Sequence, residues 1–589
     1  MSGPDAAGAP DTRDAPGHVA PETRDAPRHR APDAPGTAWA SRDWALPVLS
    51  GLLLVASFPP FTLLVPPFVA LVPFLVFIAE RPAGPVGRWR ALRGGYLLGL
   101  VYFGLLLHWV PIALAPFSKL AVPAFALIVL VLAGFTAAFA AALHLVRERT
   151  PVSFALAAAV LWTAAEWVQG HLGDLSFPWL GLGTAVAAYP RVAGAADLAG
   201  ARGLSLWIAA VNGLVASGIV AWRARRPVRR AAAATLVAVA LPVAYGAWRV
   251  ETLEMRPAAR VAVVQPNIPE ELKMDAAAAV DSTLAALRTL MARIPPGSVD
   301  LVVWPEVTFP VAFERPEHRR LREAVRAMSA RAGAPLLVGA YAVDGVAGGN
   351  EADGAGQAGR GIESGPPADV ALRNSAFVVA PDGPTGEAYH KRFLVPFVER
   401  VPFVERVPFV DPGWLDGLFG DARRFGGLSP GRGAPTFALG DARYGVLICF
   451  ESIFARHARA LRGAGADFLV NMTNDAWYGR ERWYARTSAL WQHPAHLAMR
   501  AIELRVGIAR AANTGFSLFV DPLGRMYERT ALLEPDVRVA TVYTTDAPTL
   551  FARWGDWVGT TAAVAASVLV GMAIGSCGRR RAAPGGRRG

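Results

Sequence analysis

Long apolar runs recur in the first half of the chain and give way to short alternating runs in the second half. About 20 apolar residues are needed to cross a hydrocarbon core of about 30 Å. We place runs of suitable length at 44–61, 63–79, 94–114, 120–146, 152–170, 204–222, 231–249 and 555–576. The pattern therefore predicts a membrane helical bundle of about eight transmembrane helices.

Between residues 258 and 546, short β-branched runs alternate with stretches of helical periodicity. The strand candidates begin at Arg260, Leu301, Pro335, Ser375, Tyr444 and Asp467. The helix candidates are 276–293, 318–332, 453–463 and 494–505. This alternation is typical of an α/β domain with buried sheets, and the length suits one large domain.

These patterns divide the chain into five parts. Residues 1–42 are rich in Pro, Ala, Asp and Arg, so we expect a disordered tail. A bundle of seven helices follows at 43–250, then the α/β domain at 258–546, a C-terminal membrane helix at 553–577 and a basic cytoplasmic tail at 578–589. Within the α/β domain, 344–369 is rich in Gly, Ala and acidic residues and reads as a solvated insertion.

Composition supports a membrane protein and charge gives its orientation. The chain is 53% hydrophobic, with a mean hydropathy of +0.31 and a net charge of +12. Nucleic acid is rejected as a partner, because the arginines lie in the tails and in the loops after the second, fourth and sixth apolar runs. By the positive-inside rule both termini are cytoplasmic, and the α/β domain lies on the outer face of the cytoplasmic membrane.

Lysine is rare in this chain, which has 59 Lys and Arg residues. The only lysines are Lys119, Lys273 and Lys391. Because arginine is the default cation here, a retained lysine suggests a need for a compact ammonium.

Chemically capable side chains lie at the ends of three strand candidates. Glu306 comes just past the apolar run 301–304, Lys391 follows another strand candidate, and Cys449 ends the run 444–449. A thiol nucleophile needs a base for its proton and a positive donor at the developing oxyanion. A carboxylate with a pKa raised by a dry pocket serves as the base, and the Lys391 ammonium with the backbone N–H of Phe450 serves as the donor. Taken alone, each of these residues is more simply explained as a solvated residue at the rim of the sheet or as part of the core. Taken together, they indicate acyl transfer.

The motifs around these residues resemble two related families. Residues 258–546 resemble the nitrilase (carbon-nitrogen hydrolase) superfamily, and about 42–577 resembles the apolipoprotein N-acyltransferase family. The matching stretches are Val264-Gln-Pro-Asn267, Trp304-Pro-Glu306, Lys391-Arg-Phe-Leu-Val-Pro-Phe-Val-Glu399, Ile448-Cys-Phe-Glu451, Thr473-Asn-Asp-Ala-Trp-Tyr-Gly479, His493, Arg500-Ala-Ile-Glu503 and Asn513-Thr-Gly515.

The resemblance implies an α-β-β-α sandwich with Glu306 as base, Lys391 as oxyanion stabiliser and Cys449 as nucleophile. It also implies supporting roles for Glu399 and Glu451. The implied reaction moves an acyl chain from a phospholipid to the N-terminal amine of a diacylglyceryl-modified apolipoprotein, through a cysteine thioester. The resemblance implies no cofactor and no metal; His493 and His496 lack further ligands nearby.

Two departures from the family pattern affect the loop after Lys391. Val398 stands where the family has glycine, and the hexapeptide Val-Pro-Phe-Val-Glu-Arg is duplicated. Either Glu399 or Glu405 therefore fills the second acidic position, and the intact spacing from Lys391 favours Glu399. Further candidates for substrate binding are Trp304, Tyr389, Asn474 and Trp477.

Two other functions compete with the first. A membrane-tethered amidase would use the same three residues on a small C–N substrate, but a single anchor would suffice for it. A transporter with an outer binding module would need charged residues inside the spans, where they are scarce.

Overall fold

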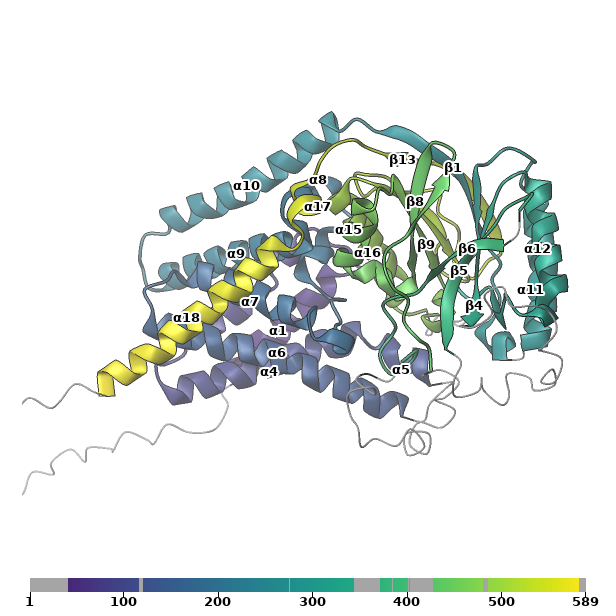
Figure 1. The fold of residues 1–589 in the computed structure, drawn as a ribbon. Coiled ribbons are helices and arrows are strands. Elements are labelled where there is room, and N and C mark those ends of the chain that lie inside the picture. Colours follow the sequence, from purple (N-terminus) through teal and green to yellow (C-terminus); the bar gives the residue numbers. More distant parts are fainter. Residues whose placement is uncertain are drawn as a thin grey trace, which may run out of the picture.

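In the computed structural model, a helical bundle and an α/β domain lie side by side (Figure 1). The residues described are 41–115, 120–274, 276–343, 371–383, 385–400, 402, 427–479 and 486–581. The predicted tail 1–42, the insertion 344–369, Lys119 and Glu405 lie wholly or almost wholly outside them.

Within the described residues, the bundle consists of the α-helices before the first strand and the two after the last strand. Its helices are α1 (Ser41–Ser57), α2 (Pro66–Val69), α3 (Val72–Ala79), α4 (Pro85–Leu106), α5 (Trp109–Leu114), α6 (Ala121–Arg149), α7 (Phe154–Gln169), α8 (Pro190–Ala193), α9 (Ala196–Arg223), α10 (Arg229–Thr252), α17 (Leu550–Trp554) and α18 (Trp557–Arg581). Each predicted apolar run thus contains helix.

The count of about eight crossings is not confirmed. Among the described helices, α6, α9, α10 and α18 are long and apolar enough to cross a membrane. The second predicted run is divided into α2 and α3, where Pro66 and Pro67 open one helix and Pro73 the next. Shorter apolar helices lie at 43–57, 66–79 and 154–169.

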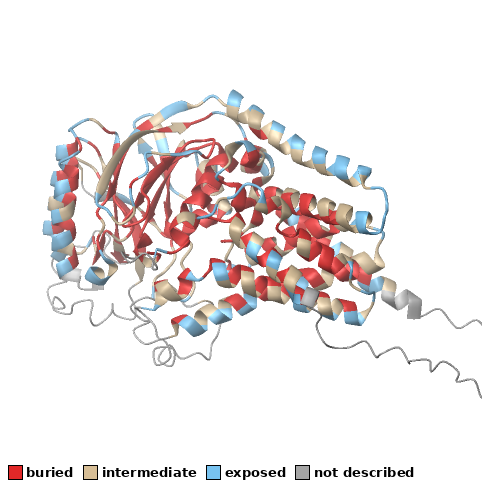
Figure 2. Ribbon diagram, turned by 180° about the vertical axis from the view of Figure 1, so that it is seen from behind, coloured by how far each residue is buried: buried red, intermediate tan, exposed pale blue. Residues whose placement is uncertain are grey.

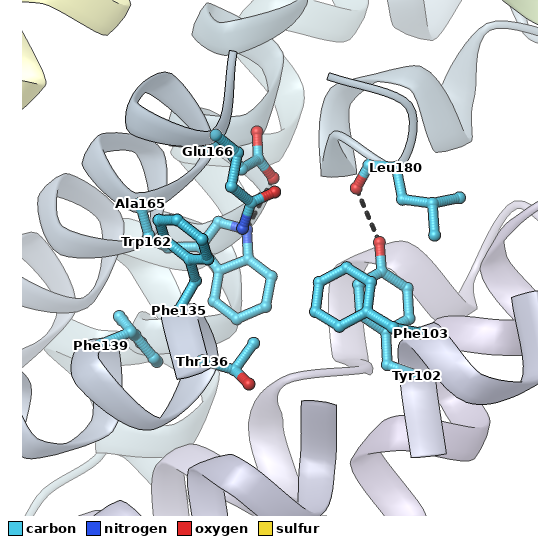
Figure 3. Close-up of a pocket in the computed structure, with 10 residues that line it drawn as sticks. Tyr102, Phe103, Phe135, Thr136, Phe139, Trp162, Ala165, Glu166 and Leu180 are labelled. Atoms are coloured by element: carbon cyan, nitrogen blue, oxygen red, sulfur yellow. Dashed lines mark hydrogen bonds between the residues drawn. The ribbon is translucent and has the colours of Figure 1, made fainter. Parts of the chain in front are cut away.

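Two hydrogen-bonded side chains, Tyr102 and Glu166, line a small cavity inside the bundle. In a small cavity among α4, α6 and α7, the Trp162 indole donates to Glu166 at 2.8 Å, and the Tyr102 hydroxyl donates to the Leu180 carbonyl at 2.7 Å (Figure 3). The backbone N–H of Leu182 also donates to Glu166, at 2.8 Å. Glu166 therefore holds the 177–183 segment to α7, a structural role.

Burial differs sharply between the helices of the bundle. Most of α10 is exposed, whereas the sheets and the helices between them and the bundle are buried (Figure 2). A long apolar helix with an exposed surface is suited to contact with lipid.

The first sheet of the α/β domain has the strand order β13-β1-β2-β4-β5-β6, and β3 pairs with β4 off this path. The strands are β1 (Arg256–Gln265), β2 (Leu301–Val303), β3 (Phe309–Ala312), β4 (Leu336–Val343), β5 (Leu372–Val379), β6 (Thr385–His390) and β13 (Asp536–Thr544). The helices α11 (Ala276–Met291) and α12 (Arg319–Ala332) cover its outer face (Figure 1).

The second sheet has the order β12-β11-β10-β9-β8-β7. Its strands are β7 (Thr436–Leu439), β8 (Ala442–Ile448), β9 (Phe468–Thr473), β10 (Gly507–Ala512), β11 (Leu518–Val520) and β12 (Met526–Tyr527). The helices α15 (Ala455–Gly463) and α16 (Ala489–Leu504) lie between this sheet and the bundle (Figure 1). The layers form the expected α-β-β-α sandwich.

Parallel pairing brings chemically capable residues to one edge. In the first sheet β1, β2 and β4 are parallel, and in the second β8, β9 and β10 are parallel. The carboxyl ends of parallel strands meet at one edge, which is where α/β folds place their sites. Glu306 follows β2, Cys449 follows β8 and Asn474 follows β9.

Buried polar contacts join the bundle to the α/β domain. The Arg505 guanidinium, just after α16, forms an ion pair of 2.8 Å with Asp197 of α9. The backbone N–H of Ala201 donates to Glu503 at 2.8 Å, and the Trp179 indole donates to Gln492 at 2.8 Å. Trp179 is therefore buried at the contact between the bundle and the α/β domain.

Candidate active site

Cys449 lies at a sharp turn where β8 ends. Its backbone has φ of +50°, in the left-handed region that residues with a Cβ rarely adopt. The apolar residues before it are buried in the sheet, and Cys449 opens the 3-10 turn η6 (Cys449–Ile453). Such strain is found at functional sites, where surrounding contacts fix the turn. The free thiol is 6% exposed.

The buried Glu451 carboxylate holds this turn. It accepts hydrogen bonds from the backbone N–H of Ile448 at 2.7 Å, from that of Arg392 at 2.7 Å and from the Tyr389 hydroxyl at 2.6 Å. Arg392 directly follows Lys391, so a single carboxylate fixes both the Cys449 turn and the chain that carries Lys391. These contacts are consistent with the supporting role expected for Glu451, and the Tyr389 hydroxyl is bound to this carboxylate.

Glu306 is brought close to β4 by a turn after β2. The next residue, Val307, has φ of +43°. In β4, a Cβ on Gly339 would lie 2.2 Å from the Pro305 carbonyl oxygen and 2.9 Å from the Glu306 Cα. Only glycine at position 339 allows this approach.

Lys391 follows β6 and is paired with two carboxylates. Its Nζ lies 2.8 Å from Oε1 of Glu306 and 2.8 Å from Oε1 of Glu399. The lysine side chain is 1% exposed. An ammonium has three N–H donors, so one remains beyond these contacts. Glu399 thus contacts Lys391 as its intact spacing leads us to expect, while Glu405 lies outside the described residues.

Two asparagines complete the pairing of these carboxylates. The Asn374 side chain donates to Glu306 at 2.7 Å and to Glu399 at 3.1 Å. The backbone N–H of Asn474 donates to the other oxygen of Glu306 at 3.0 Å. The sequence does not single out Asn374, since it lies inside a strand that shows no chemical motif.

Electrostatics fix the charges of the resting site. Burial would lower the pKa of Lys391, but the Glu306 and Glu399 carboxylates raise it well above its ordinary value. Burial would raise the pKa of Glu306, but the Lys391 ammonium and hydrogen bonds hold it below its ordinary value. The pKa rise expected for this carboxylate is therefore wrong, because a buried ammonium outweighs desolvation.

Burial, and then the Glu306 charge, raise the pKa of the Cys449 thiol, and Lys391 opposes them. The resting site thus holds a carboxylate, an ammonium and a protonated thiol.

A second buried network supports Cys449 from the other side. A ring nitrogen of His493 lies 3.1 Å from the Cys449 carbonyl oxygen, and the other lies 3.2 Å from Asp475. The Arg510 guanidinium forms an ion pair of 2.6 Å with Asp475. Burial would raise the pKa of Asp475, but Arg510 and His493 hold it well below its ordinary value. Within the described residues no group of side chains is arranged to hold a metal ion.

The structure places Trp304 and Trp477 in different apolar cores. Trp304 is fully buried in the apolar layer under α11 and α12, so it is not brought to the site. Trp477 packs against the main core, half-buried. Asn474 reaches Glu306 through its backbone, while its side chain donates to Glu270 at 2.6 Å.

Lys273 is a further residue near the site. The Nζ of Lys273 is buried and has no hydrogen-bond partner among the described residues. Burial lowers its pKa, while Glu270 and Glu306 act to raise it. The sequence signal that singles out Lys273 is the rarity of lysine in this chain.

Aromatic side chains from both parts of the protein line the junction beside Cys449. The Phe450 ring stacks on Phe177 with centroids 6.2 Å apart. Trp179 stacks on His493 at 5.5 Å, and Trp109 meets Tyr478 edge-on at 5.1 Å. The bundle therefore packs aromatic surface against the region around Cys449.

Two family models match the chain. The apolipoprotein N-acyltransferase N-terminal domain matches residues 50–214, and the carbon-nitrogen hydrolase family matches residues 260–548. Among solved structures, Nit3 of Saccharomyces cerevisiae, described as a member of the nitrilase superfamily, is 15% identical with a TM-score of 0.33. The match covers 50% of this chain and 92% of Nit3.

Curated relatives match along most of the chain. An apolipoprotein N-acyltransferase of Chlorobaculum tepidum is 31% identical, with 85% of this chain and 91% of the relative covered. One from Geobacter metallireducens is 30% identical, with 90% of this chain and 95% of the relative covered. The chain belongs to the apolipoprotein N-acyltransferase family.

Proposed function

We propose that this membrane acyltransferase takes an acyl chain from a phospholipid and holds it as a thioester on Cys449. It then transfers the chain to the N-terminal amine of an S-diacylglyceryl-cysteine on a lipoprotein. The observation that carries the proposal is the contact between Lys391 and Glu306, 2.8 Å long and buried at the strand edge that also carries Cys449.

The first step forms the thioester. The Cys449 sulfur attacks the ester carbonyl carbon of the phospholipid while its proton passes to Glu306. The third N–H of the Lys391 ammonium and the backbone N–H of Phe450 donate to the oxyanion of the tetrahedral intermediate. The C–O bond then breaks, and the alkoxide takes the proton from Glu306 and leaves as lysophospholipid.

The second step reverses these roles. The lipoprotein amine attacks the thioester carbon and gives a proton to Glu306. The C–S bond breaks, and the departing thiolate takes that proton, so the product is an amide and the free enzyme is restored. Glu306 acts as base and then as acid in each half-reaction.

The arginine-rich loops support an outer location for the α/β domain. Arg147 donates to the Arg81 carbonyl at 2.7 Å, and Arg223 forms an ion pair of 2.6 Å with Glu80. The loops that follow α3, α6 and α9 therefore meet at the end of the bundle away from the α/β domain (Figure 1). By the positive-inside rule that end faces the cytoplasm, so both termini are cytoplasmic in a multi-pass inner-membrane protein. We propose the same division of the chain into domains: a membrane bundle at 43–250, a catalytic domain at 258–546 and a C-terminal membrane helix at 553–577.

A transfer assay tests the function against the amidase alternative. Purified protein is incubated with phospholipid labelled in its acyl chains and a diacylglyceryl-cysteine peptide with a free N-terminus. The proposal predicts labelled amide on that peptide and none on an N-acetylated control peptide. Hydrolysis of small amides without transfer to the peptide would favour the amidase instead.

A further inference from the structure

Two guanidinium groups share one phenyl ring close to the nucleophile. The Arg456 Cζ lies 4.8 Å from the Phe393 ring centroid, and the Arg392 Cζ lies 5.5 Å from it. Both arginines are exposed. Across the described part of the chain, neither guanidinium has a hydrogen bond or ion pair with the protein. Burial, and then the charges of Arg392 and Arg202, lower the pKa of Arg456.

Paired cations without a counter-ion are suited to an anionic ligand. The aromatic faces hold both guanidinium planes, which reduces the conformational freedom lost on binding. A guanidinium forms its strongest hydrogen bonds with carboxylate or phosphate oxygens, with two N–H groups in parallel. A ligand with one shared negative group would relieve the repulsion between Arg392 and Arg456.

A row of aromatic rings leads from this pair to the nucleophile. Phe393 stacks on Phe454 with centroids 4.6 Å apart, and Phe454 meets Phe450 edge-on at 5.2 Å. Phe450 is the residue after Cys449. The anion site and the thiol are therefore separated by apolar surface, which suits the glycerol and acyl parts of a lipid.

Contacts of α15 connect the pair to the start of a membrane helix. Arg459, three residues after Arg456 on α15, donates to the carbonyls of Ala552 at 2.7 Å and Arg553 at 2.8 Å. These belong to α17, directly before the membrane helix α18. Trp554 and Trp557, at that junction, are 57% and 37% exposed. Exposed tryptophans at the end of a membrane helix mark the membrane–water interface.

We propose that Arg392 and Arg456 bind the phosphate of the phospholipid acyl donor, and so place its ester carbonyl at Cys449. This inference rests on the proposed function and adds the site that recognises the donor. The phosphodiester carries a negative charge whatever the headgroup, so the site selects phospholipids as a class over neutral glycerolipids. The ester carbonyls are joined to that phosphate through glycerol, so holding the phosphate restricts where the ester can lie.

The test compares the double variant Arg392→Gln/Arg456→Gln with a matched control, Arg326→Gln/Arg331→Gln. The control removes two exposed arginines from α12, on the side of the α/β domain away from the bundle (Figure 1). Each protein receives phosphatidylcholine or a diacylglycerol with the same acyl chains, in neutral detergent micelles. Zwitterionic phosphatidylcholine avoids attraction by net charge alone. The rate of thioester formation on Cys449 is measured.

In wild type and control, Cys449 should be acylated at least about tenfold faster from phosphatidylcholine than from diacylglycerol. A tenfold preference corresponds to about 1.4 kcal/mol. The Arg392→Gln/Arg456→Gln variant should lose that preference, through a slower reaction with phosphatidylcholine and an unchanged one with diacylglycerol. An unchanged preference in the variant, or an equal loss in the control, would overturn the proposal.

Binding of a diether phosphatidylcholine, which has no ester to cleave, separates this proposal from the acyl-transfer chemistry. Wild type and control should bind it at least about tenfold more tightly than the double variant. Equal binding by all three proteins overturns the phosphate site. Weaker binding by the double variant supports the phosphate site, whether or not a thioester forms. The absence of a thioester in all three proteins would contradict the proposed function and not the phosphate site.

Discussion

The ammonium of Lys391 lies 2.8 Å from the carboxylate of Glu306 before any substrate arrives. This ion pair stabilises the charged form of both partners, so Glu306 rests as a carboxylate with a lowered pKa. The Cys449 thiol has a raised pKa beside them. Transfer of a proton from this thiol to Glu306 is uphill by itself, so we infer that it occurs as the sulfur attacks the ester.

Replacing Glu306 by Gln should therefore have opposite effects on catalysis and on simple thiol chemistry. Without a base, acyl-enzyme should form at least about 100-fold more slowly from phospholipid. The same change removes a negative charge that raises the thiol pKa, so the thiolate fraction at a fixed pH increases. Alkylation of Cys449 by iodoacetamide should become faster, and its pH midpoint should fall.

The control for that experiment is Glu317→Gln, a carboxylate exposed on the domain surface, which should change neither rate. In wild type, the alkylation rate should continue to increase as the pH is raised beyond about 8.5, the ordinary thiol pKa. If the Glu306→Gln variant forms acyl-enzyme at the wild-type rate, another residue acts as the base, and Glu399 and Glu451 are the next candidates. A higher pH midpoint in this variant would contradict the resting charges.

Lys391→Arg should damage acylation almost as much as Lys391→Ala, despite keeping the charge. The Nζ is held at 2.8 Å from both Glu306 and Glu399 in a pocket where the side chain is 1% exposed. A planar guanidinium is larger and cannot occupy the position of a compact ammonium. Single-turnover acylation rates of the two variants measure this, and an active Lys391→Arg enzyme would mean that positive charge alone is enough.

The sequence points to Glu306, Lys391 and Cys449 because each follows a predicted strand. Parallel pairing brings the strand ends before Glu306 and Cys449 to one edge, while Lys391 arrives from the antiparallel strand β6. The limits of the sequence are physical. Asn374 and Gly339 act from within strands, where no local pattern marks them, and their roles depend on register. The low pKa of Glu306 depends on a partner 85 positions away in the chain. Residue Pro494 suggested a helix start, but α16 begins at Ala489 and contains that proline.

Strands with weak or short patterns were also missed. The sequence analysis predicts none of β3, β7 and β10 to β13, since several of these strands are short or mixed in polarity. The break in the second apolar run, by contrast, follows from its prolines.

Gly339→Ala should impair catalysis by displacing Glu306. The new methyl group would meet the Pro305 carbonyl oxygen at 2.2 Å and the Val307 nitrogen at 2.7 Å. Both are backbone atoms, so relief requires movement of the turn that carries Glu306, at a cost of about 1–3 kcal/mol in unfolding free energy. Gly463→Ala, where a Cβ meets nothing within 4 Å, is the control. Thermal unfolding and acylation rates give the comparison, and normal values in Gly339→Ala would remove the case for a required glycine.

The orientation predicts where a reporter will work. A reporter inserted near residue 350, in the insertion of the α/β domain, should be active on the outer face of the cytoplasmic membrane. A fusion at the C-terminus, after the basic residues 579–581, should report the cytoplasm. Alkaline phosphatase and green fluorescent protein fusions measure the two sides, and a reporter near 350 that is active only in the cytoplasm would reverse the topology.

Mass spectrometry of the peptide that carries Cys449 tests the central claim most directly. After incubation with phospholipid alone, the wild-type peptide should gain the mass of one acyl chain, and hydroxylamine should remove it as expected of a thioester. Adding a diacylglyceryl lipoprotein should discharge the acyl group onto the lipoprotein amine. Cys449→Ser and Cys449→Ala should fold without forming the thioester. Transfer to the lipoprotein by either variant at the wild-type rate, or by wild type with no acyl group ever found on Cys449, would contradict the account.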